Sequence, residues 1–139
     1  MSHNCAENGE ATVEFLALVV AIIVPLAYFI FTLATVQATI FASEAAARES
    51  ARILAHDHTR TAFAQRQVDQ IFTDYQAGSP RNLAITCDPA PCNGTSTVHV
   101  QVDATVDLPL MPDRWAGALS PIPIRVHVAM PTHRVHLEP

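Results

Sequence analysis

A long apolar stretch near the start of the chain is the strongest pattern in the sequence. Residues 15–34 read FLALVVAIIVPLAYFIFTLA, in which only Pro25 and Thr32 are not apolar. About 20 such residues are enough to cross the hydrocarbon core of a bilayer as a helix. The pattern therefore predicts a transmembrane helix. Pro25 removes one backbone hydrogen bond inside this helix, which predicts a kink or a flexible point.

A cleaved secretory signal is the competing interpretation of this stretch. Val36-Gln37-Ala38 loosely resembles a cleavage site between small residues. However, the apolar run exceeds the usual signal core of about 7 to 15 residues, and residues 5–14 contain no Lys or Arg. These two observations favour a retained helix. Neither flank has a clear excess of Lys or Arg, so charge alone does not set the orientation.

Helix-forming residues continue beyond the apolar stretch, with no Gly or Pro from residue 37 to residue 57. This part is rich in Ala, Glu and Arg, which are strong helix formers. The pattern predicts that the membrane helix runs on into water as a stalk, to about residue 56. Weak surface ion pairs are expected at helical spacing, between Glu44 and Arg48 and between Glu49 and Arg52.

A second, shorter helix is predicted after a break at Asp57-His58-Thr59. It begins at Thr59 or Thr61, where a hydroxyl side chain can cap it, and it ends near Gly78. One stripe of this helix is apolar and needs a partner surface: Val68, Ile71, Phe72 and Tyr75.

Alternating apolar and polar residues predict strands in the rest of the chain. The clearest strand spans Val98 to Leu108, a second extends from Ile122 to Met130, and a shorter one covers Leu83, Ile85 and Cys87. In each strand one face is expected to join the core and the other to face water. The apolar stripe of the second helix is expected to cover the core face.

Together these elements predict an α+β fold: a long N-terminal transmembrane and stalk helix, a second amphipathic helix, and a small antiparallel sheet of about three strands. Two loops connect the strands. The first, residues 88–97, contains the turn signal Asn93-Gly94, and the second covers residues 109–121.

Composition and charge exclude several classes of protein. Only 15% of the residues are charged, against about 25% in a typical soluble domain. Asp, Glu, Lys and Arg are absent from Phe15 to Ser43, and the remainder is enough for one small domain. The net charge is -5, all 8 basic residues are Arg, and they form no cluster, so a nucleic acid partner is not expected.

The three cysteines fall into two groups. Cys87 and Cys92 flank Asp88-Pro89-Ala90-Pro91, a tight loop that suits a small disulfide outside the cytoplasm. Two free buried thiols are the alternative, and a metal site would need two more ligands. Cys5 precedes the predicted span and therefore lies on the opposite side of the membrane.

Candidate catalytic chemistry is sparse in this sequence. His99 and His127 lie on the water-facing sides of predicted strands, with Asp103 nearby on the same face as His99. We interpret them as solvated side chains rather than as a metal site or a proton switch. The chain shows no nucleophile elbow and no glycine-rich phosphate loop, so we expect no enzyme activity, no cofactor and no metal.

The junction before the apolar stretch carries a family resemblance. Residues 8–15 read NGEATVEF, so Gly9 is followed by four residues and then by Glu14-Phe15 at the start of a long apolar helix. This junction resembles the processing site of type IV pilin-like precursors. The segment ATVEF-x-A, the mid-span proline and the Ala/Arg/Glu stalk resemble the TadE-like pseudopilins of tight-adherence pilus systems, most of all those of the actinobacterial type. The resemblance is specific over about residues 9–52 and looser beyond.

The resemblance implies proteolytic processing and a domain order. A membrane aspartyl prepilin peptidase cuts such chains after the glycine, here between Gly9 and Glu10. Residues 1–9 would be a cytoplasmic leader peptide, residues 10–57 the transmembrane and stalk helix, and residues 58–139 a small extracytoplasmic α+β domain. Glycine at the cut allows extended backbone to enter the peptidase cleft without a Cβ clash.

The resemblance also implies roles for the first residues of the mature chain. Glu14 would pair with the new α-amino group of a neighbouring subunit and set the axial register in assembly, next to Phe15 at the membrane edge. The alternative is that Glu14 is an ordinary interfacial charge that reaches the headgroups. The implied partners are the prepilin peptidase, other pilin or pseudopilin subunits, the pilus assembly platform and the membrane.

The resemblance further implies a topology. The leader would lie in the cytoplasm and the C-terminal domain outside, in a single-pass protein of the cytoplasmic membrane that can be extracted into a surface pilus. Cys5 would be removed with the leader, which leaves Cys87 and Cys92 as a natural pair. The expected function is that of a minor pilin-like structural protein in pilus assembly or initiation. The alternative function is an uncleaved single-pass anchor whose extracytoplasmic domain binds a partner or a ligand.

Overall fold

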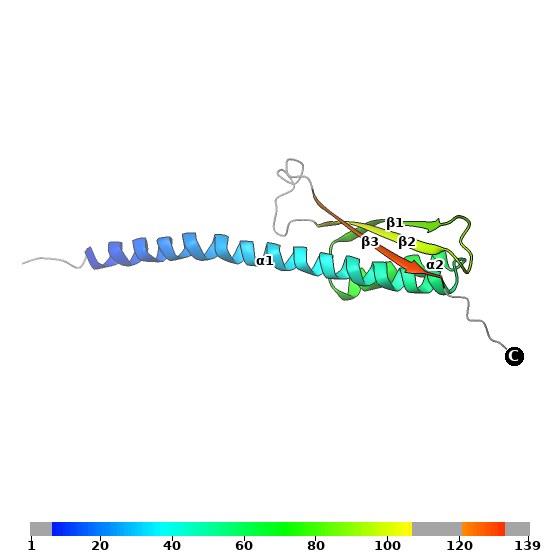
Figure 1. Cartoon of the computed structure of the whole chain (residues 1–139). Coiled ribbons are helices and arrows are strands. Elements are labelled where there is room, and N and C mark those ends of the chain that lie inside the picture. Colours follow the sequence, from blue (N-terminus) through cyan, green and yellow to red (C-terminus); the bar gives the residue numbers. More distant parts are fainter. Residues whose placement is uncertain (1–6, 107–120, 133–139) are drawn as a thin grey trace, which may run out of the picture. The chain divides into compact units, whose positions relative to one another are not determined.

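The computed structural model describes residues 7–106 and 121–132, and the side chains from residue 11 onward. Its elements follow the order α1 (Glu7–His56), α2 (Thr61–Asp74), β1 (Ser79–Asp88), β2 (Thr97–Val106) and β3 (Ile122–Pro131), as Figure 1 shows. Two helices and an antiparallel sheet confirm the predicted α+β fold. The chain divides into two compact units between Ala34 and Thr35, called here the N-terminal and C-terminal units.

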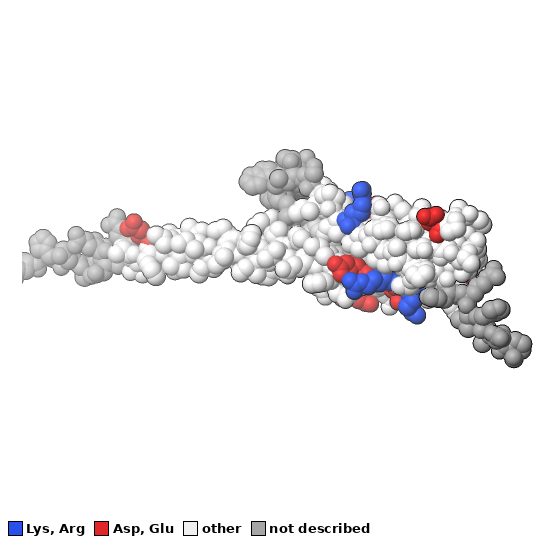
Figure 2. Space-filling model, in the orientation of Figure 1, with Lys and Arg blue, Asp and Glu red and all other residues white. Residues whose placement is uncertain are grey.

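The described part of the N-terminal unit is helical throughout. Helix α1 begins at Glu7, a few residues before the predicted domain boundary, and continues through Pro25 without interruption. A local kink at Pro25 stays a prediction. By length and composition, α1 holds one candidate membrane span, and no residue of its apolar window is buried among the described residues. Along the visible face of this helix, Figure 2 shows a long surface without charged atoms.

The C-terminal unit is built on a sheet with the strand order β1-β2-β3, in which both neighbouring pairs are antiparallel. The central strand β2 confirms the predicted alternation. Its apolar side chains are fully or almost fully buried: Val98, Val100, Val102, Ala104 and Val106. Its polar side chains are half-buried: Thr97, His99, Gln101, Asp103 and Thr105. Each buried valine contributes about 1.5 to 3 kcal/mol through removal of apolar surface from water.

The strand boundaries differ in part from the predicted ones. Strand β1 is longer than predicted because it begins at Ser79 and accommodates an irregularity in register between Pro80 and Asn82. Its first residues have no apolar alternation, so the pattern gave no signal for them. The predicted end of β2 at Leu108 and most of the predicted loop at 109–121 lie outside the described residues.

The second half of α1 corrects the expectation of a free stalk. From Thr39 to Leu54, one face of the helix is buried and joins the core cluster with β2 and α2. This face consists mainly of small side chains, and its apolar members belong to the core cluster. The buried residues on α1 are Thr39, Ala42, Ser43, Ala46, Ala47, Ser50, Ala51, Ile53 and Leu54.

The other face of this part of α1 carries the predicted surface ion pairs. The nearest N–O distance is 2.8 Å between Arg48 and Glu44, and 2.6 Å between Arg52 and Glu49. The hydrogen bond from Arg52 lowers the pKa of the Glu49 carboxyl from its ordinary value. Both arginine side chains are largely exposed, so these pairs add little to stability.

Helix α2 confirms the second predicted helix with two corrections. Its N-cap is Arg60, which makes no capping hydrogen bond with its side chain. The Asp57 carboxylate instead accepts hydrogen bonds from the Thr59 amide and hydroxyl in the preceding turn, at 3.0 and 2.6 Å. The buried stripe is Ala64, Val68 and Phe72, whereas Tyr75 is 48% exposed and lies outside it. Tyr75 is the C-cap, where the helix has already ended.

Candidate functional site

The junction of the predicted processing site lies in the first turns of α1. Gly9 and Glu10 belong to the helix, and their side chains are outside the described residues. Glu14 and Phe15 follow about one turn later, and both side chains are exposed, Phe15 by 68%. The structure thus brings the predicted residues onto one continuous helix. Their roles in cleavage and in assembly stay predictions.

The apolar surface behind this junction is largely exposed. From Phe15 to Leu33 most of the large apolar side chains are between 46% and 68% exposed, whereas Val19 and Tyr28 are half-buried. Thr32, a polar residue in this stretch, donates its hydroxyl hydrogen bond to the Tyr28 carbonyl at 2.9 Å, within the helix itself. Polar groups satisfied in this way are compatible with a hydrocarbon environment.

A disulfide joins Cys87 and Cys92, which confirms the predicted pair and excludes two free thiols in this structure. Ser96 organises the loop that the disulfide closes. Its hydroxyl lies 2.9 Å from the Pro89 carbonyl oxygen and 2.8 Å from Asn93 Oδ1, and it accepts a hydrogen bond from the Asn93 amide at 3.0 Å. The loop is therefore held by side-chain hydrogen bonds as well as by the covalent link.

Thr132 connects the same loop to the end of β3. Its amide donates to the Ser96 carbonyl at 2.9 Å, and its hydroxyl lies 2.6 Å from the Asn93 carbonyl oxygen. The first residue after β3 therefore closes the loop from the other side. The pattern of the sequence pointed to a turn at Asn93-Gly94 but gave no signal for these contacts.

The water-facing side of the sheet brings the two predicted histidines together. His99 lies opposite Ala129, and His127 lies opposite Gln101, so the histidines are diagonal neighbours on β2 and β3. Their ring centroids are 5.3 Å apart and the rings are stacked. The predicted cross-strand proximity is confirmed.

Asp103 on the same face has partners that the sequence analysis missed. Arg125, directly opposite on β3, donates from Nε to Asp103 Oδ1 at 2.9 Å, and Gln101 donates to the same oxygen at 3.0 Å. The hydrogen bond from Arg125 holds the pKa of the Asp103 carboxyl below its ordinary value. The Asp103 carboxylate therefore accepts hydrogen bonds from both Arg125 and Gln101. The sequence analysis would have found the Asp103–Arg125 pair if the register of β2 against β3 had been known.

Clusters suited to bound ions or substrates are few in the described part of the chain. Within residues 7–106 and 121–132, no group of three or more His, Cys, Asp or Glu side chains has the arrangement to hold a metal ion. One hollow of about 440 Å³ lies where α2 meets β1, and its lining includes Asp69 as the one ionisable side chain: Asp69, Phe72, Thr73, Gln76, Ala77, Gly78, Ser79 and Pro80.

The features that stand out are therefore surfaces and the predicted processing junction. The exposed apolar helix, the segment from Gly9 to Phe15 and the disulfide-closed loop are the described features that bear on function. Comparison with protein-family models, with curated proteins and with solved structures finds no match to this chain.

Proposed function

We propose that this protein is a pilin-like structural protein of the TadE-like pseudopilin type, which a prepilin peptidase cuts after Gly9. In this proposal the mature chain is held in the cytoplasmic membrane by α1 and takes part in assembly or initiation of a tight-adherence type pilus. Its partners are the peptidase, other pilin or pseudopilin subunits and the assembly platform.

The observation that carries the proposal is the position of the junction on α1. Gly9 and Glu14-Phe15 stand at the start of one unbroken helix, whose apolar turns are exposed and whose later turns are built into a folded unit. A subunit of this kind offers an apolar helical surface to neighbours or lipid, while its folded unit is tied directly to the same helix. These are the physical requirements of a subunit that assembles through its N-terminal helix.

The start of α1 is compatible with cleavage. The Gly9–Glu10 bond lies in the first turns of the helix, and the first four amide groups of any helix have no partners within it. Opening these turns for a peptidase cleft therefore breaks few hydrogen bonds, and helix ends fray at little cost. Gly9 adds backbone freedom at the position that has to become extended.

The exposed carboxylate of Glu14 supports a role in subunit register. A charge at the edge of hydrocarbon is costly unless it is paired or reaches water. Cleavage after Gly9 creates an α-amino group on Glu10, which offers a charge opposite to that of Glu14 on a neighbouring copy. In this proposal, Glu14 recognises that amino group and fixes how far one helix slides along the next.

The disulfide supports the topology of the proposal. A bond between Cys87 and Cys92 forms and persists in oxidising surroundings, outside the cytoplasm. The C-terminal unit then lies on the outer side of the membrane, and the residues before α1 lie on the cytoplasmic side, where the peptidase of this family acts.

N-terminal sequencing and intact mass of the membrane-extracted protein test the proposal. Co-expression with a prepilin peptidase is expected to remove residues 1–9 and expose Glu10. We expect Gly9→Ala to reduce this shift and Gly9→Leu to abolish it, whereas Gly94→Ala in the loop between β1 and β2 leaves it unchanged. A full-length wild-type mass in the presence of active peptidase would instead favour the uncleaved membrane anchor.

A further inference from the structure

We propose that the C-terminal unit carries a lipid-contacting collar, which rests in the interfacial layer of the bilayer. The collar consists of Ile40, Phe41, Tyr75 and Ile122. The inference rests on the membrane-spanning role that the proposed function gives to α1, and it is independent of cleavage and of pilus assembly.

The collar residues are distinguished by exposure. Their side chains are 36% exposed for Ile40, 59% for Phe41, 48% for Tyr75 and 39% for Ile122. Elsewhere among the described residues of the C-terminal unit, the large apolar side chains are buried or half-buried. Exposed apolar groups that gather in one place mark contact with another apolar phase.

Three of the four residues gather around one hydrogen bond. Gly78 donates its amide to the Thr39 hydroxyl at 3.0 Å, which joins α1 to the segment after α2. Ile40 and Phe41 directly follow Thr39 on α1, and Tyr75 precedes Gly78 by a single short turn. Helices α1 and α2 therefore place these side chains at the same end of the unit, called here the Thr39 end.

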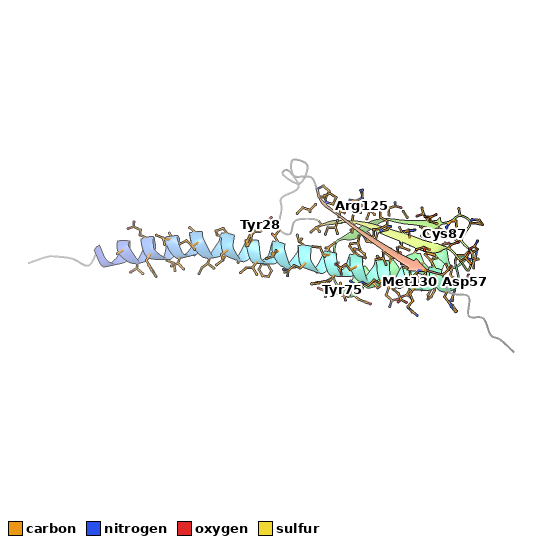
Figure 3. All side chains as sticks on the ribbon, in the orientation of Figure 1. Tyr28, Asp57, Tyr75, Cys87, Arg125 and Met130 are labelled. Carbon is orange, nitrogen blue, oxygen red and sulfur yellow. A yellow bond between two sulfur atoms is a disulfide. The ribbon has the colours of Figure 1, made fainter. Side chains whose placement is uncertain are left out.

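The sheet places the fourth residue at the Thr39 end as well. The backbone of Gly78 lies against the Thr105 carbonyl, so closely that a Cβ at this position would overlap with it. The next residue, Val106, pairs with Ile122 at the start of β3. Figure 3 shows the same separation along the unit, with Tyr75 at one end and Asp57, Cys87 and Met130 at the other.

The arrangement favours lipid over a docked protein as the occupant. Phe41 is two residues from Thr39, so its side chain points about 200° around α1 from the one that meets Gly78. Tyr75 and Ile122 come from other elements of the unit. Ile40 and Phe41 therefore point to other sides of α1 than Thr39, next to which Tyr75 and Ile122 lie, and the four side chains do not form a single face. A second protein would cover one side of such an arrangement, whereas a lipid layer contacts every side.

The position in the chain agrees with the depth of the interfacial layer. Ile40 follows Ala34, the last residue of the predicted span, by six residues. A helix rises about 9 Å over this number, comparable with the headgroup layer of about 5 to 8 Å that adjoins the hydrocarbon core. Tyrosine is enriched at this depth because its ring is apolar and its hydroxyl is polar.

Fluorescence quenching in nanodiscs that hold one chain each tests the collar. Single cysteines are placed in a Cys5→Ser background and labelled with an environment-sensitive dye, with Cys87 and Cys92 protected by their disulfide. The reporter is Asp74→Cys, next to Tyr75, and the matched control is Ala62→Cys at the start of the same helix; Leu26→Cys reports on the span. The bilayer is phosphatidylcholine with a fraction of lipids that carry a quencher, placed near the headgroup in one preparation and in the middle of the acyl chain in another.

We expect strong quenching at position 74 by the headgroup quencher, strong quenching at position 26 by the acyl-chain quencher, and weak quenching at position 62 by either. Replacing both aromatic residues with serine, Phe41→Ser with Tyr75→Ser, is expected to lower the ratio of docked to undocked units about tenfold or more, because two exposed aromatic side chains lose their apolar contact. These positions are exposed, so the core is unchanged. Tryptophan at both positions is expected to retain quenching.

Two results would overturn the collar, and they are distinguishable. Quenching at position 26 together with equal, weak signals at positions 74 and 62 would remove the collar and leave the spanning helix and the pilin-like proposal in place. Absence of quenching at position 26 would show that α1 does not span the bilayer, which would remove the membrane basis of both proposals.

Discussion

The hydroxyl of Thr39 binds the amide of Gly78 across 39 positions of sequence, and this contact joins α1 to the strand region. Thr39 is fully buried, and its hydroxyl also donates to the Thr35 carbonyl at 2.9 Å, so both of its hydrogen-bonding functions are used. Gly78 has no room for a side chain because the Thr105 carbonyl lies where a Cβ would be. The helix, the segment after α2 and β2 therefore meet at one point.

Replacing the Thr39 hydroxyl should measure how much its hydrogen bond with the Gly78 amide contributes to stability. Thr39→Val keeps the shape but leaves the Gly78 amide without its acceptor, which is expected to lower the free energy of unfolding by about 1 to 2 kcal/mol. Thr39→Ser keeps the acceptor and should cost less. Urea denaturation of the detergent-solubilised chain gives both values, and equal stability of the two variants would show that the hydrogen bond contributes nothing.

The outcome for α1 shows what periodicity can and cannot predict. In β2, strongly apolar valines alternate with polar residues, and this contrast was enough to identify the buried face. In the second half of α1 the buried face consists of Ala, Ser and Thr, whose weak hydropathy hides it from such a pattern. The sequence therefore predicted the helix correctly but predicted water on a side that packs against the sheet.

Some of the candidate sites could also be predicted from the sequence, and others could not. The Cys87–Cys92 pair was predictable because five positions of sequence separation and two prolines leave little conformational choice. The ion pair between Asp103 and Arg125 depends on the register of two strands that are distant in sequence, and composition does not supply a register. The roles of Gly9 and Glu14 came from a family resemblance and stay predictions.

The end of α2 offers a test of backbone strain. Gln76 has a φ of 49°, in the left-handed region, and its amide donates to the Thr73 carbonyl while the Ala77 amide donates to the Phe72 carbonyl. This is the Schellman pattern, in which glycine is the preferred residue. We expect Gln76→Gly to raise the free energy of unfolding by up to about 1 kcal/mol, since a side chain in this conformation costs about 1 to 2 kcal/mol and glycine adds entropy to the unfolded chain.

A second glycine variant controls for the effect of the residue itself. Gln70→Gly lies at an exposed position inside α2 and is expected to lower stability by about 0.5 to 1 kcal/mol. Thermal unfolding of both variants under one condition gives the comparison. Destabilisation of similar size at positions 70 and 76 would contradict the assignment of strain to Gln76.

From the disulfide we predict the reactivity of the two cysteines and the stability of a variant without the bond. In native, unreduced protein, Cys87 and Cys92 should resist alkylation until a reductant is added. The double variant Cys87→Ser, Cys92→Ser is expected to lose about 2 kcal/mol of stability, the amount that the loop-entropy relation gives for so short a loop. Mass spectrometry counts the modified thiols, and Cys5→Ser is the matched control. Two thiols that react readily before reduction would contradict the bond.

A variant at Glu14 tests assembly separately from cleavage in the proposed function. If it pairs with the α-amino group of a neighbouring subunit, Glu14→Gln leaves an ammonium without its partner in apolar surroundings, where breaking such a pair costs about 3 to 5 kcal/mol. This corresponds to roughly two to four powers of ten in an association constant. Cleavage should survive, because the cut follows Gly9, about one helical turn earlier.

The measurement is crosslinking to pilus partners in cells that contain the peptidase, with the processed mass recorded in the same sample. We expect Glu14→Gln to be cleaved and its crosslinked yield to collapse, and Glu14→Asp, which keeps the charge on a shorter side chain, to restore part of the yield. An ordinary interfacial charge predicts otherwise, because an amide at the headgroup boundary costs little. A cleaved Glu14→Gln protein that crosslinks as well as wild type would therefore assign assembly to the apolar surface of α1 alone.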